Sequence, residues 1–324
     1  MTPPQESQGI LIDEADLDAM AVESESARPI RRARDPVTEF REFHGWTLDK
    51  LDVFDTYLKL YRRVAGGGAY IDAFAGTGHG VSTTLRRDGQ RDGSSVIAAK
   101  SGAFSSLHLI ECDSNHLQML RRTVGALSDR LASRVCIHHG DCNAVIPELL
   151  TSDTLDATRP CFAFLDQEST QLNWDTVETL ASWKTYRPPP TMTGRPKTCK
   201  VELWILFNSH QAIYRLWPHD RQKYPESFSP DTLDRVFGSR EAWWDLWENN
   251  EPASALVFRF ANQLRRLGYQ YVLPQLFNDR STGRPQYHML HATDHPSAVS
   301  FMRWAKRSTD GYETQRLPGL ESNT

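Results

Sequence analysis

Short apolar runs alternate with helix-like segments between residues 69 and 209, and this alternation limits the fold more than any other feature of the chain. The runs are apolar at nearly every position, which is typical of strands that are buried on both faces of a parallel sheet. Such strands, alternating with helices, indicate a doubly wound α/β sheet with helices on both faces. We predict strands at 69–76, 106–112, 134–140, 161–166 and 201–209, with helices at 116–127, 144–150 and 174–183.

An amphipathic helix precedes the alternation, and two more strands follow it. The helix is expected to begin at Thr47 as its N-cap and to end at the glycines 66–68. Its apolar face, at helical spacing, is formed by Leu51, Phe54, Leu58 and Tyr61. A Trp-rich helical insertion is predicted at 213–252, before the last two strands at 271–277 and 287–293, and we expect it to form a lid with a hydrophobic core.

The composition fits one large domain between two tails. The chain has 324 residues, of which 39% are hydrophobic, and this is enough for one large core. Seven of the first 30 residues are acidic, and few large apolar residues accompany them. We therefore predict a disordered acidic tail at 1–35, one domain at 36–310 and a flexible C-terminus at 311–324.

Charge and cysteine usage exclude several classes of protein. A net charge of −4 does not suit a protein that coats nucleic acid non-specifically. The five cysteines form no C-x-x-C pair, which argues against a disulfide framework and a structural zinc site. No apolar run approaches the ~18–20 residues of a membrane span, and the first residues lack the order of a signal peptide. We expect a cytoplasmic protein with reduced thiols and no bound metal.

The stretch YIDAFAGTGHG at 70–80 ends the first predicted strand in three glycines. A dinucleotide-binding loop requires G-x-G-x-x-G, but Val81 stands at the third glycine position. A P-loop requires a lysine after the glycines, and none follows here. The loop therefore belongs either to a ligand pocket of another kind or to a glycine turn that binds nothing.

This stretch resembles the first motif of the class I S-adenosylmethionine (SAM) methyltransferases, in its D-x-F-A-G-T-G form. The matching residues are Asp72, Phe74, Gly76, Thr77 and Gly78. Glycines leave no side chain between the backbone and the methionine part of SAM. The resemblance implies that Asp72 meets the ammonium group of SAM, directly or through water.

Acidic residues also follow the second and third predicted strands. Glu111, with Asp113 as its alternate, ends the second strand, where a carboxylate of this fold holds the ribose hydroxyls. Asp141, with Asn143 beside it, follows the third strand, where an acidic residue commonly faces the adenine amino group. Three such positions in series favour a SAM-binding sheet over a glycine turn without a ligand.

The fourth predicted strand ends in Asp166-Gln167-Glu168, where catalytic groups are found in sheets of this kind. Amino-group methyltransferases often carry [DN]-P-P-[FYW] at this point, and this chain keeps only the aspartate. We take Asp166 as the residue that positions or deprotonates an acceptor, with Glu168 as a second candidate. In the alternative interpretation, both carboxylates cap a helix that starts near Leu172.

Several segments together resemble the three-Cys-motif partner (TcmP) family, between about residues 42 and 306. The more specific ones are the W-T-x-x-K-L helix at 46–51 and the closing ATDHPSAVSFM at 292–302; the family's F-L-D-P-[FY]-G motif is F-L-D-Q-E-S here. The resemblance implies a Rossmann-like SAM-methyltransferase fold, SAM as cofactor, and a separate three-Cys partner that looks like a radical-SAM enzyme. Nucleic acid is a further candidate substrate. The alternative function is a SAM-fold binding subunit of that partner, without methyl transfer.

Overall fold

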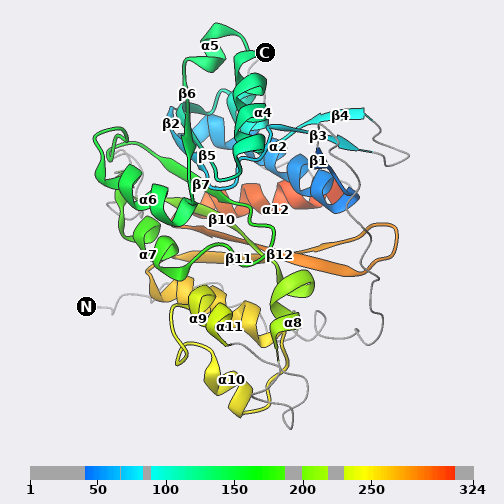
Figure 1. The fold of residues 1–324 in the computed structure, drawn as a ribbon. Coiled ribbons are helices and arrows are strands. Elements are labelled where there is room, and N and C mark those ends of the chain that lie inside the picture. The colour runs from blue at the N-terminus through cyan, green and yellow to red at the C-terminus, as the bar shows by residue number, and fades with distance from the viewer. Residues whose placement is uncertain (1–40, 66, 83–88, 187–198, 218–229, 311–324) are drawn as a thin grey trace, which may run out of the picture. The chain divides into compact units, whose positions relative to one another are not determined.

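The computed structural model describes residues 41–65, 67–82, 89–186, 199–217 and 230–310 (Figure 1). The predicted tails at 1–35 and 311–324 lie outside these residues, as does most of the Pro-rich basic loop at 185–200. All of the described residues belong to one compact unit, Phe40–Thr324.

A seven-stranded sheet forms the centre of this unit, in the order β11-β12-β10-β7-β2-β5-β6. Five strands run parallel to one another, and β12 pairs antiparallel with both β10 and β11. The strands are β2 (Gly68–Asp72), β5 (Phe104–Glu111), β6 (Val135–His139), β7 (Cys161–Leu165), β10 (Glu202–Phe207), β11 (Tyr271–Asn278) and β12 (Pro285–Thr293). The predicted Rossmann-like α/β sheet is therefore confirmed, and the strand order reverses between β2 and β7.

Helices cover both faces of the sheet (Figure 1). One apolar cluster packs the sheet against α2 (Gly45–Ala65), α3 (Ser94–Ser101), α4 (Ser114–Gly125) and α12 (Pro296–Asp310). The other packs it against α6 (Cys142–Thr151), α7 (Trp174–Ser182) and α11 (Ala255–Arg266). Neighbouring strand residues join opposite clusters, as Tyr70 and Ile71 do, and both are fully buried. This explains why the strand sequences are apolar at every position instead of alternating.

Helix α2 confirms the predicted apolar face but not the predicted start. Its four predicted face residues are all buried, and the helix ends at Ala65 as expected. It begins at Gly45, however, and the backbone N–H of Thr47 already donates to the carbonyl of His44. Thr47 therefore lies inside the first turn and is not the N-cap.

A small second sheet, which was not predicted from the sequence, follows the glycine loop. It joins β1 (Arg41–Glu42), β3 (His79–Ser82) and β4 (Gly89–Asp92), with β3 and β4 antiparallel. Strands this short and polar give no apolar run from which to predict them. The chain returns to the loop at Gly93, whose N–H donates to the carbonyl of Gly78 at 2.7 Å, and α3 begins at the next residue.

The region of the predicted insertion contains short helices and buried tryptophans. A π-helical turn at Ser209–Ile213 leads into α8 (Tyr214–Leu216), and α9 (Asp231–Phe237) and α10 (Trp244–Glu248) follow. Trp217 and Trp243 are buried in the same cluster as α7 and α11, as a hydrophobic lid core requires. The remaining short elements are α5 (Asp129–Ala132), β8 (Lys184–Tyr186) and β9 (Cys199–Lys200). Among the helices of the described ranges, none is long and apolar enough to cross a membrane.

Phe54 occupies the centre of the aromatic core that joins α2 to the sheet. It is fully buried, and its ring lies 4.7 Å from Phe164 and 5.8 Å from Trp204, centroid to centroid. Phe54→Ala should lower the free energy of unfolding by about 3–5 kcal/mol, because it leaves a cavity among rigid rings. Urea denaturation measures this. Val64→Ala, at a position that is 45% exposed on the same helix, is the control. A loss for Phe54→Ala as small as that of the control would contradict this packing.

Candidate functional site

Four carboxylates follow the carboxyl ends of four adjacent parallel strands. Asp72 ends β2 and Glu111 ends β5, while Asp166 directly follows β7. Asp141 lies two residues after β6. The strand order places all four along one edge of the sheet, around the point between β2 and β7 where it reverses. This is the edge at which doubly wound sheets bind ligands.

Two cavities open along this edge, and both are lined by Phe74. The larger has a volume of about 330 Å³, and the smaller of about 60 Å³. The larger is lined by Ala73, Phe74, Ile110, Glu111, Cys112, Gly140, Asp141, Cys142, Asn143, Gln171, Asn173 and Arg235. The smaller is lined by Phe43, Thr47, Lys50, Leu51, Phe74, Ala75, Gly76, Thr77, Gly78, His79, Gly93, Ser94 and Asp166.

Glu111 connects the larger cavity to the glycine loop. Its Oε2 accepts a hydrogen bond from the Gly76 N–H and its Oε1 accepts one from the Asp113 N–H, both at 2.8 Å. The side chain is buried but still lines the cavity. Each carboxylate oxygen has a second lone pair, so Glu111 can hold the loop and accept from a ligand at the same time.

The glycine loop lines the smaller cavity and is fastened to α4. Gly76 and Gly78 have positive φ values of 59° and 79°, which only glycine adopts readily. A Cβ on Gly78 would also approach the Thr123 Cγ2 to 2.8 Å. The Thr123 hydroxyl in turn donates to the carbonyl of Thr77 at 2.9 Å. The loop therefore lines the cavity with glycine backbone, while the Thr123 and Glu111 side chains hold it in place.

Asp141 and Asn143 both line the larger cavity, and both also have structural contacts. Asp141 caps α6 by accepting from the Asn143 N–H at 2.9 Å. The Asn143 side-chain amide donates to the Gln171 carbonyl at 2.7 Å and accepts from the Asn173 N–H at 2.9 Å. Asn143 therefore fixes the segment before α7 against α6, and the exposed carboxylate of Asp141 stays at the cavity wall.

Asp72 is fully buried and lines neither cavity. It accepts hydrogen bonds from the Tyr70 hydroxyl at 2.9 Å and from the Ser94 hydroxyl at 2.7 Å. Burial raises the pKa of its carboxyl to about 6, the nearby charge of Asp166 adds to the rise, and the hydrogen bonds oppose it. Ser94 lines the smaller cavity, so the Asp72 carboxylate is connected to that cavity through the Ser94 hydroxyl.

Asp166 forms an ion pair with Lys50 of α2, and both side chains line the smaller cavity. The Lys50 Nζ lies 2.5 and 2.6 Å from the two carboxylate oxygens and 5.5 Å from the centre of the Tyr287 ring. The interpretation of Asp166 as a helix cap is wrong, because α7 begins at Trp174 with Asn173 as its N-cap. Lys50 was not among the predicted site residues, although it lies in the W-T-x-x-K-L motif.

Gln167 fixes the backbone directly after Asp166. Its buried side-chain amide donates to the Leu206 carbonyl at 3.0 Å and accepts from the Leu172 N–H at 2.9 Å. Glu168 is exposed and lies outside the lining of both cavities. Asp113 is likewise exposed, and it caps α4 through the Asn115 and His116 N–H groups. The roles predicted for Glu168 and Asp113 gain no support from this placement.

Arg235 of α9 is the one basic residue on the described lining of the larger cavity. It is exposed, and it lines this cavity together with Glu111 and Asp141. The sequence predicted a lid from this insertion, but no local pattern indicated which of its residues would reach the site.

No family model and no curated protein matches the chain. Solved structures match it with low identity. A putative O-methyltransferase from Klebsiella pneumoniae is 13% identical over 76% of this chain and 80% of that chain, with a TM-score of 0.41. The METTL16 methyltransferase domain is 9% identical over 76% and 67%, with a TM-score of 0.40. The M. jannaschii protein TYW2, solved in complex with AdoMet, is 9% identical over 78% and 76%, with a TM-score of 0.38. Matches this distant say nothing about the site beyond what its own topology and geometry show.

The raised pKa of Asp72 predicts a pH-dependent stability. The folded protein holds the proton of Asp72 up to a pH of about 6, whereas the unfolded chain releases it near the ordinary value of 3.8. The contribution of Asp72 to stability is therefore present below pH 3.8 and is lost as the pH rises through about 6. Relative to Asp72→Asn, the wild type should lose roughly 2–3 kcal/mol between these limits. Urea titrations of both proteins across this range measure the difference, and parallel pH profiles would contradict the assignment.

Proposed function

We propose that this protein is a SAM-dependent methyltransferase. The observation that carries the proposal is the hydrogen bond between the Gly76 N–H and Glu111, which joins the methyl-donor motif to the acidic end of the next strand. Two cavities flank this contact, and the larger falls within the range of small-molecule sites. When bound, SAM would supply an activated methyl group.

The residues that line the two cavities suit the adenosine half and the methionine half of SAM. Glu111 offers acceptor positions for ribose hydroxyls, and the Asp141 carboxylate offers one for an adenine amino group. The backbone of Gly76–Gly78, together with Ser94, surrounds the smaller cavity, where the methionine part would lie. Because Phe74 lines both cavities, it would pack between the adenosine half and the methionine half of SAM.

Asp166 is the residue we propose to orient the acceptor. Lys50 holds both of its carboxylate oxygens, and Gln167 fixes the backbone that follows it. A carboxylate fixed at the mouth of the donor pocket can accept from an acceptor N–H or O–H and align it for transfer, so that catalysis rests on proximity. The acceptor would have to share the carboxylate with Lys50 or displace it.

The ion pair also supports a second candidate function, a SAM-binding subunit without methyl transfer. Lys50 already occupies the carboxylate that an acceptor would need, and the smaller cavity holds only about 60 Å³. The three-Cys partner and a nucleic-acid substrate are proposals that rest on the family resemblance and the methyltransferase motif alone.

Labelled methyl transfer separates the two functions. The wild type is incubated with methyl-labelled SAM and with fractionated nucleic acid and protein, with and without the three-Cys partner. For a transferase, Asp166→Ala should abolish labelling and leave the affinity for SAM within about threefold, because Asp166 lines the smaller cavity and not the larger one, where the adenosine would lie. A wild type that binds SAM but labels nothing would support the binding subunit. Loss of SAM binding in Asp166→Ala would contradict the role of Asp166.

Arg235 should contribute to SAM affinity from the insertion. Arg235 lines the larger cavity, where the adenine of SAM would lie, and a guanidinium plane stacks well on an aromatic ring. Such a contact is worth about 0.5–1 kcal/mol at an exposed site. Arg235→Ala should therefore raise the Kd for SAM by roughly two- to fivefold in a calorimetric titration. Arg266→Ala, at an exposed position of α11 away from both cavities, is the control. An unchanged Kd for Arg235→Ala would show that α9 does not touch the ligand.

A further inference from the structure

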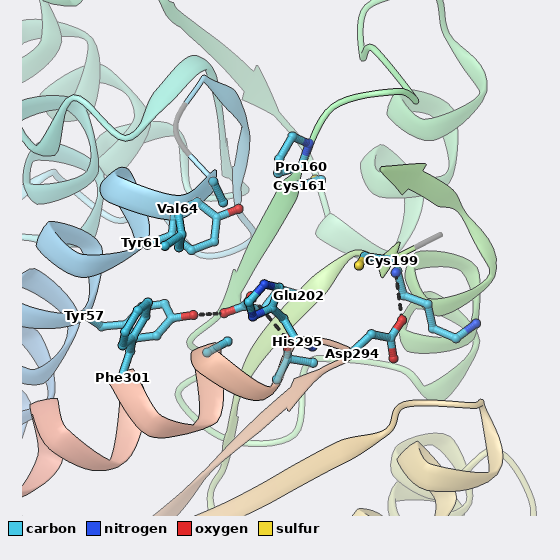
Figure 2. A pocket seen from close by; sticks show the side chains of 14 residues that line it. Tyr57, Tyr61, Val64, Pro160, Cys161, Cys199, Glu202, Asp294, His295 and Phe301 are labelled. Atoms are coloured by element: carbon cyan, nitrogen blue, oxygen red, sulfur yellow. Dashed lines mark hydrogen bonds between the residues drawn. The ribbon is translucent and has the colours of Figure 1, made fainter. Parts of the chain in front are cut away.

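A third cavity lies at the opposite, amino-terminal edge of the sheet, away from the candidate SAM site (Figure 2). Cys161 and Glu202 line it as the first residues of β7 and β10, and Thr293 lines it as the last residue of the antiparallel β12. Helices α2 and α12 supply an aromatic and aliphatic wall. That wall is formed by Tyr57, Tyr61, Val64, Ala65, Ala298 and Phe301. The cavity volume is about 50 Å³.

Glu202 is the carboxylate at the centre of this cavity. It is 8% exposed and accepts hydrogen bonds from the Tyr57 hydroxyl, from His291 Nε2 at 2.8 Å and from the Thr293 hydroxyl at 3.4 Å. Figure 2 shows the Tyr57 hydroxyl pointing at the carboxylate. An ionised carboxylate is a pure acceptor, and three donors directed at one carboxyl group favour that form.

The charge of Glu202 has no compensating cation among the described residues. Tyr57 and Thr293 are neutral donors. His291 is fully buried and its Nδ1 has no hydrogen-bond partner, so a charged ring would leave an N–H group unsatisfied in the interior. We therefore assign the neutral ring, with its proton on Nε2. No lysine or arginine of the described ranges lies within ion-pair distance of Glu202.

The other charged residues on the lining are Asp294 and Lys200. Asp294 adds a second carboxylate, which accepts from the backbone N–H groups of Lys200 and Gln270 at 3.0 and 3.2 Å. The Lys200 ammonium donates to the Ala181 carbonyl at 3.2 Å. His295 accepts the Ser297 N–H at its Nδ1, as a neutral ring does. Two carboxylates against one ammonium leave the lining with a net negative charge, and aromatic and aliphatic side chains form the wall from α2 and α12.

We propose that this cavity binds the alkylated ammonium group of a small organic cation. Aromatic rings attract such a cation, and desolvation strengthens the attraction. A primary ammonium carries three donors, and the aromatic and aliphatic wall offers them no acceptor, whereas a trimethylammonium group carries no donor. A volume of about 50 Å³ has room for about four waters, which is near the size of a trimethylammonium group.

Paired ligands test the proposal without reference to SAM. Choline is titrated calorimetrically into the full-length protein, beside its uncharged analogue in which a carbon atom replaces the nitrogen. Choline should bind at least about tenfold more tightly than the analogue. An acetylated trimethyllysine amide, measured against its own carbon analogue, distinguishes a protein side chain from a free small molecule as the source. Equal affinity of each cation and its analogue, or no binding of any of them at millimolar concentration, would overturn the proposal.

Variants then locate the binding. Glu202→Gln should remove the preference for choline over its analogue, with folding checked by circular dichroism. Phe301→Leu keeps an apolar wall but removes an aromatic ring. It should weaken choline binding several-fold and leave the affinity for the analogue unchanged. This variant tests the proposal if Glu202→Gln does not fold. A preference that persists unchanged in a folded variant would place the cation elsewhere. Glu148→Ala, at an exposed position of α6, is the control and should change neither affinity.

Discussion

The structure of the candidate site depends on the two hydrogen bonds that the Glu111 carboxylate accepts, from Gly76 and from Asp113. They tie the end of β5 to the loop that leaves β2, and so they fix the distance between two parts of a ligand site that lie 35 residues apart. The positive φ angles of Gly76 and Gly78 direct the loop into this position, and Thr123 holds it from α4. The buried Asp72 fastens the start of α3 to the same place through Ser94.

A second set of contacts fixes the segment that follows β7. Gln167 uses a buried amide to hold the segment after β7 against β10. Lys50 then fixes the direction of Asp166, and its ammonium is held by packing against Tyr287. These contacts together keep the Asp166 carboxylate on the lining of the smaller cavity.

The sheet and the positions of its four edge carboxylates could be predicted from the sequence because both leave local signals. Buried parallel strands appear as apolar runs, and the residue that ends each run lies at the ligand edge whatever the rest of the chain does. Lys50, Gln167 and Arg235 leave no such signal, since each acquires its place from an element distant in the sequence. Asp72 shows the limit of the local signal as well: its position at the end of β2 was predicted, but its burial under Tyr70 and Ser94 is a tertiary effect. The strands β3 and β4 are too short and polar to be recognised.

The central claim is that the loop at Gly76–Gly78 and Glu111 together hold SAM. Calorimetric titration of SAM and of NAD into the wild type and into Glu111→Ala tests it most directly. The wild type should bind SAM and not NAD, and Glu111→Ala should weaken SAM binding at least about tenfold, because it removes the ribose acceptor and releases the loop. No binding of SAM to the wild type at millimolar concentration, or an equal affinity in Glu111→Ala, would contradict the account.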